Sequence, residues 1–491
     1  MAAGNQTLVY RRRGMLMSGF PSWRTGLRRW IADLNPTFAA IAIFIVSGVA
    51  DLSAPVRAET ISSALSRAYV GNPDLNQQRA AGRASDEGVS RAVAGYRPQV
   101  AATGSYGYNQ INGQLSGVNV RGPSYPTTAA VTVTQNVFNG FQTLNGVRQA
   151  ESGVLQSRET TRNTEQNTLQ NGATAYMNVL RDTAILDLNK NNITVLEEQL
   201  RQTRDRFKVG EVTRTDVAQA ESSLATARSN YFTAESNLQT SVAVYRQVIG
   251  VEPSRLEAAR PIDALLPHAL PEAVSLALSE HPAIQAALHN VDAAAAQVKV
   301  NEGQLYPTVN VVGTFENNTA YAGVPSARFW NGSILGQLSV PIYTGGATFA
   351  LVRQSKELLA QAQLQADIQR DTVRAAVVSS WGQLETAKAV IRSSQAAVKS
   401  AEIALDGVRE EAKVGQRTTL DVLIAQQTLL SARVNLVSAQ RDRVVASYTV
   451  MAAVGQLSAA NLSLDVVQYN PTIHYTQVRD KWIGLRTPDG R

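Results

Sequence analysis

The 491-residue sequence contains no cysteine and only four histidines. Disulfide frameworks and thiol catalysis are therefore excluded, and a zinc site built on Cys and His clusters has too few ligands. The sequence also lacks a phosphate-binding loop, a dinucleotide-binding glycine fingerprint and a His-Glu-x-x-His motif. We therefore expect no enzyme, no catalytic residue, no cofactor and no metal site.

Most of the net positive charge lies at the start of the chain, in the pattern of an export leader. Six arginines, the last of them Arg29, precede an apolar run over 38–50, and Val56-Arg57-Ala58 fits a signal-peptidase site. We predict a signal peptide over 1–58. This leader holds seven Arg and two Asp, so it accounts for +5 of the net charge of +7. The remainder of about +2 removes the main support for nucleic-acid binding. The apolar run is shorter than the roughly 20 residues of a membrane-spanning helix, which disfavours an uncleaved anchor.

The rest of the chain contains one unit written twice, at a separation of 205 residues. Lys208–Val217 realigns with Lys413–Val422, and Val137–Gly140 realigns with Ile342–Gly345. A stretch carrying four prolines separates the two copies. We predict a first repeat over 59–250, a Pro-rich linker over 251–271, a second repeat over 272–456 and a C-terminal tail over 457–491.

Each repeat reads as helix, strand, strand, very long helix, helix. The first helices are predicted over 61–95 and 271–304, and the long helices over 141–207 and 346–412, free of proline. About 65 helical residues make a rod of roughly 100 Å, far longer than a globular domain needs. The last helix of each repeat carries a heptad seam with small d residues, mostly alanine, which permits close packing. The seam begins with Val217, Leu224 and Tyr231, and in the second copy with Val422, Leu429 and Leu436.

Four segments alternate apolar with small or polar residues at period two, over about 98–110, 127–138, 307–317 and 332–343. Their length suits strands that cross a bilayer. Tyr96, Phe138, Tyr306 and Tyr343 stand where strand meets helix, as interfacial aromatics do, and a second group lies toward the loops. That second group is Tyr125, Tyr321, Phe329 and Trp330. Two soluble hairpins with one face on a core are the alternative, but the sequence offers no amphipathic cover for that face.

Four strands cannot close a barrel, and an open edge in lipid leaves backbone groups without hydrogen-bond partners. Three copies would supply twelve strands and place twelve helices side by side. A dimer with eight strands would also close, but side chains would largely fill its bore.

Taken together, these features resemble the TolC family of outer-membrane efflux and type I secretion proteins over about 59–457. The resemblance rests on the duplicated Val-Gly-x-x-Thr-x-x-Asp tips, on Tyr96-Arg97-Pro98 and Tyr306-Pro307 before the strands, and on the glycines after them. It implies a mostly α fold with membrane β strands: a homotrimer with a 12-stranded outer-membrane β-barrel and a periplasmic α-helical barrel. The implied partners are outer-membrane lipid, a periplasmic adaptor (membrane fusion) protein and an inner-membrane ABC or proton-driven transporter. Drugs, proteins or both would leave through this duct.

The resemblance also implies roles for the tips, which in the family close the resting channel and meet the adaptor. Val209, Gly210, Val414 and Gly415 become adaptor-contact residues. The periplasmic gate carries over to four others: Thr215, Asp216, Arg417 and Asp421.

Charge suggests how such a gate would work. Arg417 could bridge to Asp216, and three Asp421 carboxylates would ring the bore and favour cations. Thr213-x-x-Asp216 and Thr418-x-x-Asp421 equally resemble capping boxes, so a purely structural role stays open. Ala412 and Ile424 stand where the family pattern has an aromatic and an acid, which thins the cation ring.

A non-conducting trimeric coiled coil, structural or adhesive, is the alternative function. It would account for the helices but not for the strands. Such a protein stays soluble without detergent and conducts no ions, which separates the two hypotheses.

Overall fold

The computed structural model describes residues 58–115, 117–320 and 328–490. The predicted signal peptide up to Arg57 and Tyr321 therefore lie outside the described residues. The body that starts at Ala58 forms one compact unit. None of its described helices is long and apolar enough to cross a membrane.

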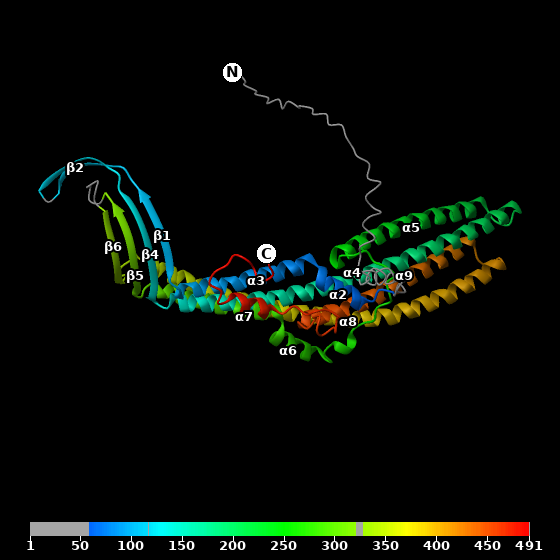
Figure 1. Ribbon diagram of the computed structural model, residues 1–491. Helices are drawn as coiled ribbons and strands as arrows, with labels where there is room; N and C mark the ends of the chain where they lie inside the picture. Colours follow the sequence, from blue (N-terminus) through cyan, green and yellow to red (C-terminus); the bar gives the residue numbers. More distant parts are fainter. Residues whose placement is uncertain (1–57, 116, 321–327, 491) are drawn as a thin grey trace, which may run out of the picture. The chain divides into compact units, whose positions relative to one another are not determined.

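Apart from a 3-10 turn and two short strands in the first repeat, helices and strands follow the same order in both repeats (Figure 1). The first repeat holds α2 (Ile61–Gly71), α3 (Pro73–Val93), the 3-10 turn η1 (Ala94–Tyr96), β1 (Gln99–Tyr106), β2 (Asn109–Leu115), β3 (Val118–Ser124), β4 (Thr127–Asn139), α4 (Gln142–Lys208) and α5 (Arg214–Ile249). The second holds α6 (Leu270–Glu280), α7 (Pro282–Gly303), β5 (Thr308–Thr319), β6 (Arg328–Ser339), α8 (Ala347–Lys413) and α9 (Thr419–Val454). The linker contains the 3-10 turn η2 (Asp263–Leu265), and the tail contains α10 (Pro471–Val478).

The first helix of each repeat is broken in two, where a single helix was predicted over 61–95 and over 271–304. Asn72 and His281 adopt nearly the same extended conformation, with φ −64° and ψ 125° against −63° and 124°. Each precedes a proline, which disfavours helical backbone at the residue before it. Asn72 Oδ1 accepts from the amides of Asp74 and Leu75, and His281 Nδ1 accepts from that of Ala283. Both residues therefore cap the helix that follows.

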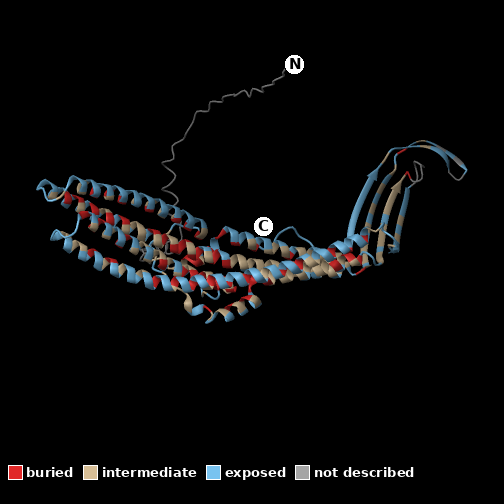
Figure 2. Ribbon diagram, turned by 180° about the vertical axis from the view of Figure 1, so that it is seen from behind, coloured by how far each residue is buried: buried red, intermediate tan, exposed pale blue. Residues whose placement is uncertain are grey.

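The long helices α4 and α8 are the scaffold of the molecule. Each has 67 residues. α4 packs against α3, α7 and α5, while α8 packs against α7 and α9 (Figure 1). The main hydrophobic cluster joins both repeats through buried residues such as Tyr176, Tyr245, Leu384 and Val450. Figure 2 shows that buried residues lie mainly on the helices, while the strands are mostly exposed or intermediate.

The predicted linker is largely irregular in conformation but is packed along its length. Leu266 belongs to the main cluster, and Leu256 and Ile262 pack against it. The Tyr176 hydroxyl lies 2.6 Å from the carbonyl oxygen of Glu59 and 2.7 Å from that of Glu257. One buried side chain therefore ties the linker to the start of the first repeat.

The four longer strands form one antiparallel sheet in the order β1-β4-β5-β6. The middle pair joins the two repeats, and β1 and β6 lie at the edges. A second ribbon, β2 with β3, was not predicted and prolongs the β1–β4 hairpin. The amide of Gly107 donates to the carbonyl of Pro126 between the two ribbons.

Candidate channel gate and membrane face

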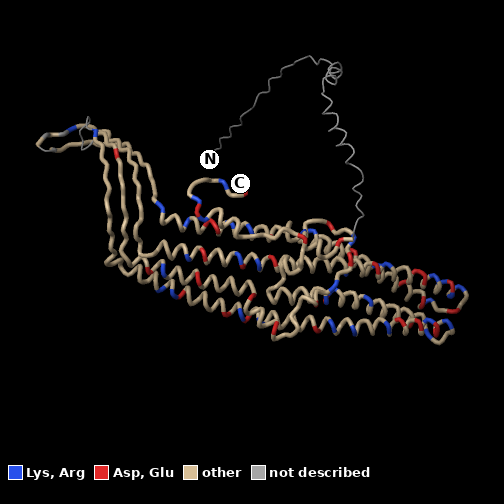
Figure 3. Tube along the Cα trace, turned by 60° about the horizontal axis from the view of Figure 1, so that its bottom comes forward, with Lys and Arg blue, Asp and Glu red and all other residues tan. Residues whose placement is uncertain are grey.

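One face of the sheet is apolar and uncovered within the chain. The register places Val100, Val133, Gly313 and Ile334 side by side in one row across the sheet. Val131 and its partner Phe315 belong to the next row on the same face. The apolar side chains on these strands remain exposed: Val100, Val131, Val133, Phe315, Ile334 and Leu338. Among the described strands, the only charged residues are Arg121, Glu316 and Arg328 (Figure 3). A sheet that presents an apolar, nearly uncharged face suits contact with lipid.

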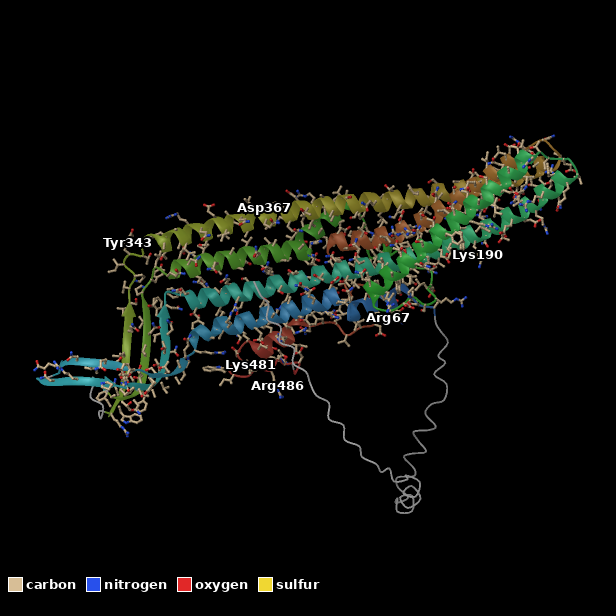
Figure 4. All side chains as sticks on the ribbon, turned by 90° about the horizontal axis from the view of Figure 1, so that it is seen from above. Arg67, Lys190, Tyr343, Asp367, Lys481 and Arg486 are labelled. Carbon is tan, nitrogen blue, oxygen red and sulfur yellow. The ribbon has the colours of Figure 1, made fainter. Side chains whose placement is uncertain are left out.

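The four predicted interfacial aromatics lie where strands join helices. Tyr96 and Tyr306 directly precede the strand starts and are exposed, and Tyr343 lies between β6 and α8 (Figure 4). Phe138 sits at the β-bulge of β4 and packs edge-on against Phe141, with ring centroids 5.1 Å apart.

Other aromatics gather at the far end of the strands. Tyr125 lies 6.3 Å from Tyr106 and 5.6 Å from Tyr108 between ring centroids, and Phe315 lies 5.5 Å from Trp330. Two aromatic bands at the two ends of the strands are typical of membrane barrels.

The tips of the two helical hairpins are built alike. Gly210 and Gly415 have φ of +82° and +80°. Their amides donate to the carbonyls of Phe207 and Ala412, and the following amides of Glu211 and Gln416 donate back to Arg206 and Glu411. This hydrogen-bond pattern is a Schellman motif, whose left-handed position favours glycine. The turn leaves one apolar residue on each tip in solvent, with Val209 71% and Val414 72% exposed.

Capping boxes follow both turns. Asp216 Oδ2 accepts from the amide and the hydroxyl of Thr213 at 2.8 and 2.7 Å, and Asp421 Oδ2 accepts from those of Thr418, both at 2.9 Å. The Thr213 side chain and backbone hold the pKa of Asp216 below its usual value, and the backbone amide and side chain of Thr418 do the same for Asp421. Both carboxylates therefore start a helix in this conformation.

The predicted gate residues lie at these tips, but Asp216, Arg417 and Asp421 are each bonded within their own tip. Arg417 Nε donates to Glu411 Oε2 at 2.8 Å, and no hydrogen bond or ion pair among the described residues of this chain joins Arg417 to Asp216. Thr215 is exposed on the first turn of α5. The first tip carries a reciprocal pair, Arg206 to Glu211 at 3.0 Å.

Sequence reasoning missed these cross-turn ion pairs. Their signal was opposite charge at a spacing of five or six residues around a glycine, with Arg206 and Glu411 at equivalent positions of the two repeats. Equivalent pairs also brace the hairpins, Arg228 to Glu197 at 2.8 Å and Arg433 to Glu402 at 2.7 Å.

A duplicated chain with a sheet face suited to lipid and two long helical hairpins has the architecture of an outer-membrane channel subunit. The family model for outer membrane efflux proteins matches residues 64–251 and 273–456. The chain is 43% identical to the outer membrane efflux protein BepC of Brucella suis over 450 residues, which is 92% of this chain and 97% of that protein. It is 29% identical to the outer membrane protein TolC of Escherichia coli K12, covering 85% of this chain and 86% of that protein.

The fold is similar to that of solved channels. The Campylobacter jejuni CmeC outer membrane channel gives a TM-score of 0.72 at 16% identity, covering 85% of this chain and 89% of that one. CusC gives 0.70 at 17% identity, covering 80% and 92%. The chain belongs to the TolC family of outer-membrane efflux proteins. It is an outer-membrane efflux or secretion channel of a non-enzymatic family whose members are trimeric channels of tripartite systems. This assignment excludes a non-conducting coiled coil.

Proposed function

We propose that three copies of this chain form the exit duct of a tripartite machine, with the helical barrel in the periplasm docked on an adaptor and, through it, on an inner-membrane ABC or proton-driven transporter. The observation that carries the proposal is the identical construction of the two tips, each presenting an exposed valine beside a left-handed glycine. Two equivalent docking points per chain would give a trimer six, arranged in a ring. A ring of identical adaptor subunits could engage them all.

The exported cargo includes small toxic compounds, proteins or both. Relatives carry names of each kind: the toluene efflux pump outer membrane protein TtgC of Pseudomonas putida and the alkaline protease secretion protein AprF of Pseudomonas aeruginosa. A strain lacking this chain should gain sensitivity to drugs, lose secreted proteins, or both. A strain with neither defect would contradict the proposed duct.

The gate in this proposal is an exchange of ion pairs. Closure moves Arg417 from Glu411 to Asp216 of a neighbouring hairpin, while Thr215 lines the same contact and three Asp421 carboxylates ring the bore. Exposed ion pairs contribute about 0 to 1 kcal/mol each, so a lock of this kind yields readily when a partner binds. The capping boxes keep both aspartates positioned in either state.

Gly415→Trp tests the docking. Bulk at the tip should lower affinity for the adaptor on the order of tenfold, the loss expected from a contact worth about 1.4 kcal/mol. Export should fall while trimer yield stays normal. Gly415→Ala keeps the same backbone strain without the bulk, and Gly382→Trp places the bulk on α8 far from the tip, where a Cβ meets nothing within 4 Å. Normal export by Gly415→Trp would overturn tip docking.

A further inference from the structure

The C-terminal tail is held along the first repeat by a series of side-chain contacts. The amide of Tyr469 donates to the Tyr69 hydroxyl at 2.9 Å, and His474 Nδ1 lies 2.9 Å from Asp86 Oδ2 in a buried pair. Farther along, Arg97 Nη1 donates to the carbonyl of Lys481 at 2.8 Å. The tail therefore follows α3 and reaches the residues that precede β1.

After α10, the tail forms a closed loop over 481–486. Lys481 Nζ donates to the carbonyl of Arg486, and Gly484 turns the chain at φ +126°. Figure 4 shows Lys481 and Arg486 close together on the tail. Between these two basic residues the loop presents three large apolar side chains to solvent: Trp482 is 67%, Ile483 90% and Leu485 102% exposed.

Arg97 fixes the place of this loop. Its guanidinium stacks on the Trp482 ring at 4.7 Å from the centroid, and Arg97 is two residues before the start of β1. Trp482 thus lies at the level of Tyr96, where strand gives way to helix. In an outer-membrane channel, this is the level of the periplasmic headgroups.

We propose that the loop 481–486 is an interfacial anchor that inserts Trp482, Ile483 and Leu485 into the periplasmic leaflet of the outer membrane. Tryptophan prefers the boundary between headgroup and acyl chain, and apolar side chains flanked by basic residues bind surfaces of anionic lipid. Lys481 and Arg486 supply those charges. Three neighbouring apolar side chains that are largely in water mark an interaction site, unlike scattered single ones.

The absence of cysteine makes the test direct, because a single introduced cysteine is labelled alone. Ile483→Cys carries a nitroxide label, and Val467→Cys is the matched control. Val467 is 93% exposed on the same tail. It lies near Tyr69, and the 28 residues from Tyr69 to Arg97 span roughly 40 Å of helix. The trimer is reconstituted in vesicles of phosphatidylethanolamine and phosphatidylglycerol, and collision with oxygen is compared with collision with a water-soluble nickel chelate.

The label at 483 should show a severalfold higher ratio of oxygen to chelate collision than the label at 467. Arg97→Ala should lower the ratio at 483 toward the control value, while Arg91→Ala, on the exposed end of α3, should not. Equal ratios at 483 and 467 would overturn the anchor. Exclusion of both reagents at 483 would also overturn it, because the loop would then pack on another copy of the chain. Single-channel conductance of the same vesicles shows that the barrel is inserted, which separates failure of the anchor from failure of the channel.

Discussion

Gly140 and Gly303 touch backbone to backbone at the joint where β4 leads into α4 and α7 ends. A Cβ on Gly140 would lie 2.2 Å from the carbonyl oxygen of Gly303, and one on Gly303 would lie 2.5 Å from that of Gly140. Gly140 also has φ +64°. The strand exit of the first repeat is thereby locked to the helix end of the second, next to the membrane face.

Gly140→Ala should destabilise the trimer far more than Gly345→Ala. Gly345 is the repeat equivalent, with the same φ of +64° but nothing within 4 Å of a Cβ. A left-handed alanine costs about 1–2 kcal/mol at both sites, and overpacking adds about 1–3 kcal/mol at Gly140 alone. Thermal unfolding of the two variants measures the difference. An equal loss of stability in the two variants would show that the backbone around Gly140 and Gly303 moves apart to accommodate the added methyl group.

The second capping box should make the start of α9 sensitive to acid. Hydrogen bonds from Thr418 lower the pKa of Asp421 from its ordinary 3.8. The pKa of Asp421 is therefore lower in the folded chain than in the unfolded chain. Its contribution to stability is complete above the unfolded pKa and is lost as the pH falls through the folded pKa. Amide protection at Thr418 and Asp421, corrected for intrinsic exchange, should stay constant from about pH 7 to 5 and decline below 3.8. Asp421→Asn should weaken protection at neutral pH and flatten that dependence, and an unchanged profile would argue against the box.

The proposed gate predicts that loss of the Arg417–Asp216 pair and loss of the Arg417–Glu411 pair change the conductance in opposite directions. Arg417→Ser should raise single-channel conductance in planar bilayers, as should Asp216→Ala. Glu411→Gln should lower it, because it releases Arg417 from its partner at 2.8 Å and leaves it for Asp216.

Two control variants separate the lock from local damage. Thr213→Val removes the hydroxyl of the capping box but keeps the backbone amide that holds the Asp216 carboxylate, and Arg433→Ser breaks a hairpin ion pair away from the tip. Neither should open the channel as Arg417→Ser does. Conductance unchanged in both Arg417→Ser and Asp216→Ala would remove the lock.

The buried pair of Asp86 and His474 should control release of the tail. Burial raises the pKa of Asp86, and the hydrogen bond from His474 opposes that rise. His474→Ala removes the imidazole, Asp86→Asn removes the carboxylate, and the double variant removes both. The cycle should show a coupling of about 0.5–3 kcal/mol. The rate of protease cleavage between α10 and the C-terminus measures release of the tail. Additive effects of the two substitutions would mean that the pair does not hold the tail in place.

The long helices could be predicted because nothing interrupts them. Proline is absent from α4 and α8. The heptad seam of α5 contains most of the buried residues of that helix, whereas most buried residues of α9 lie off its seam, because α9 also packs against α4. The four sheet strands show period two because one face is apolar. The β2 strand also alternates, with Gln110, Asn112 and Gln114 on one face and Ile111, Gly113 and Leu115 on the other. Its period of two was therefore present in the sequence, although the strand was not predicted.

The broken first helices show a different limit. Asn72-Pro73 and His281-Pro282 are visible in the sequence at matching places in the two repeats, and each dipeptide ends one helix and caps the next. At the tips, the motif located the turns, but pairing of Arg417 with Glu411 depends on how the turn folds back. Spacing along the chain places a charge on a tip without selecting its partner.

The position of β1 and β6 at opposite edges of the sheet has a genetic consequence. If each copy must offer one edge to the copy on either side, a subunit that folds but carries a damaged edge still enters assemblies and spoils the intact copies beside it. Alleles that alter these two edges should therefore behave as dominant in cells that also make the normal chain, whereas alleles that prevent folding should be recessive.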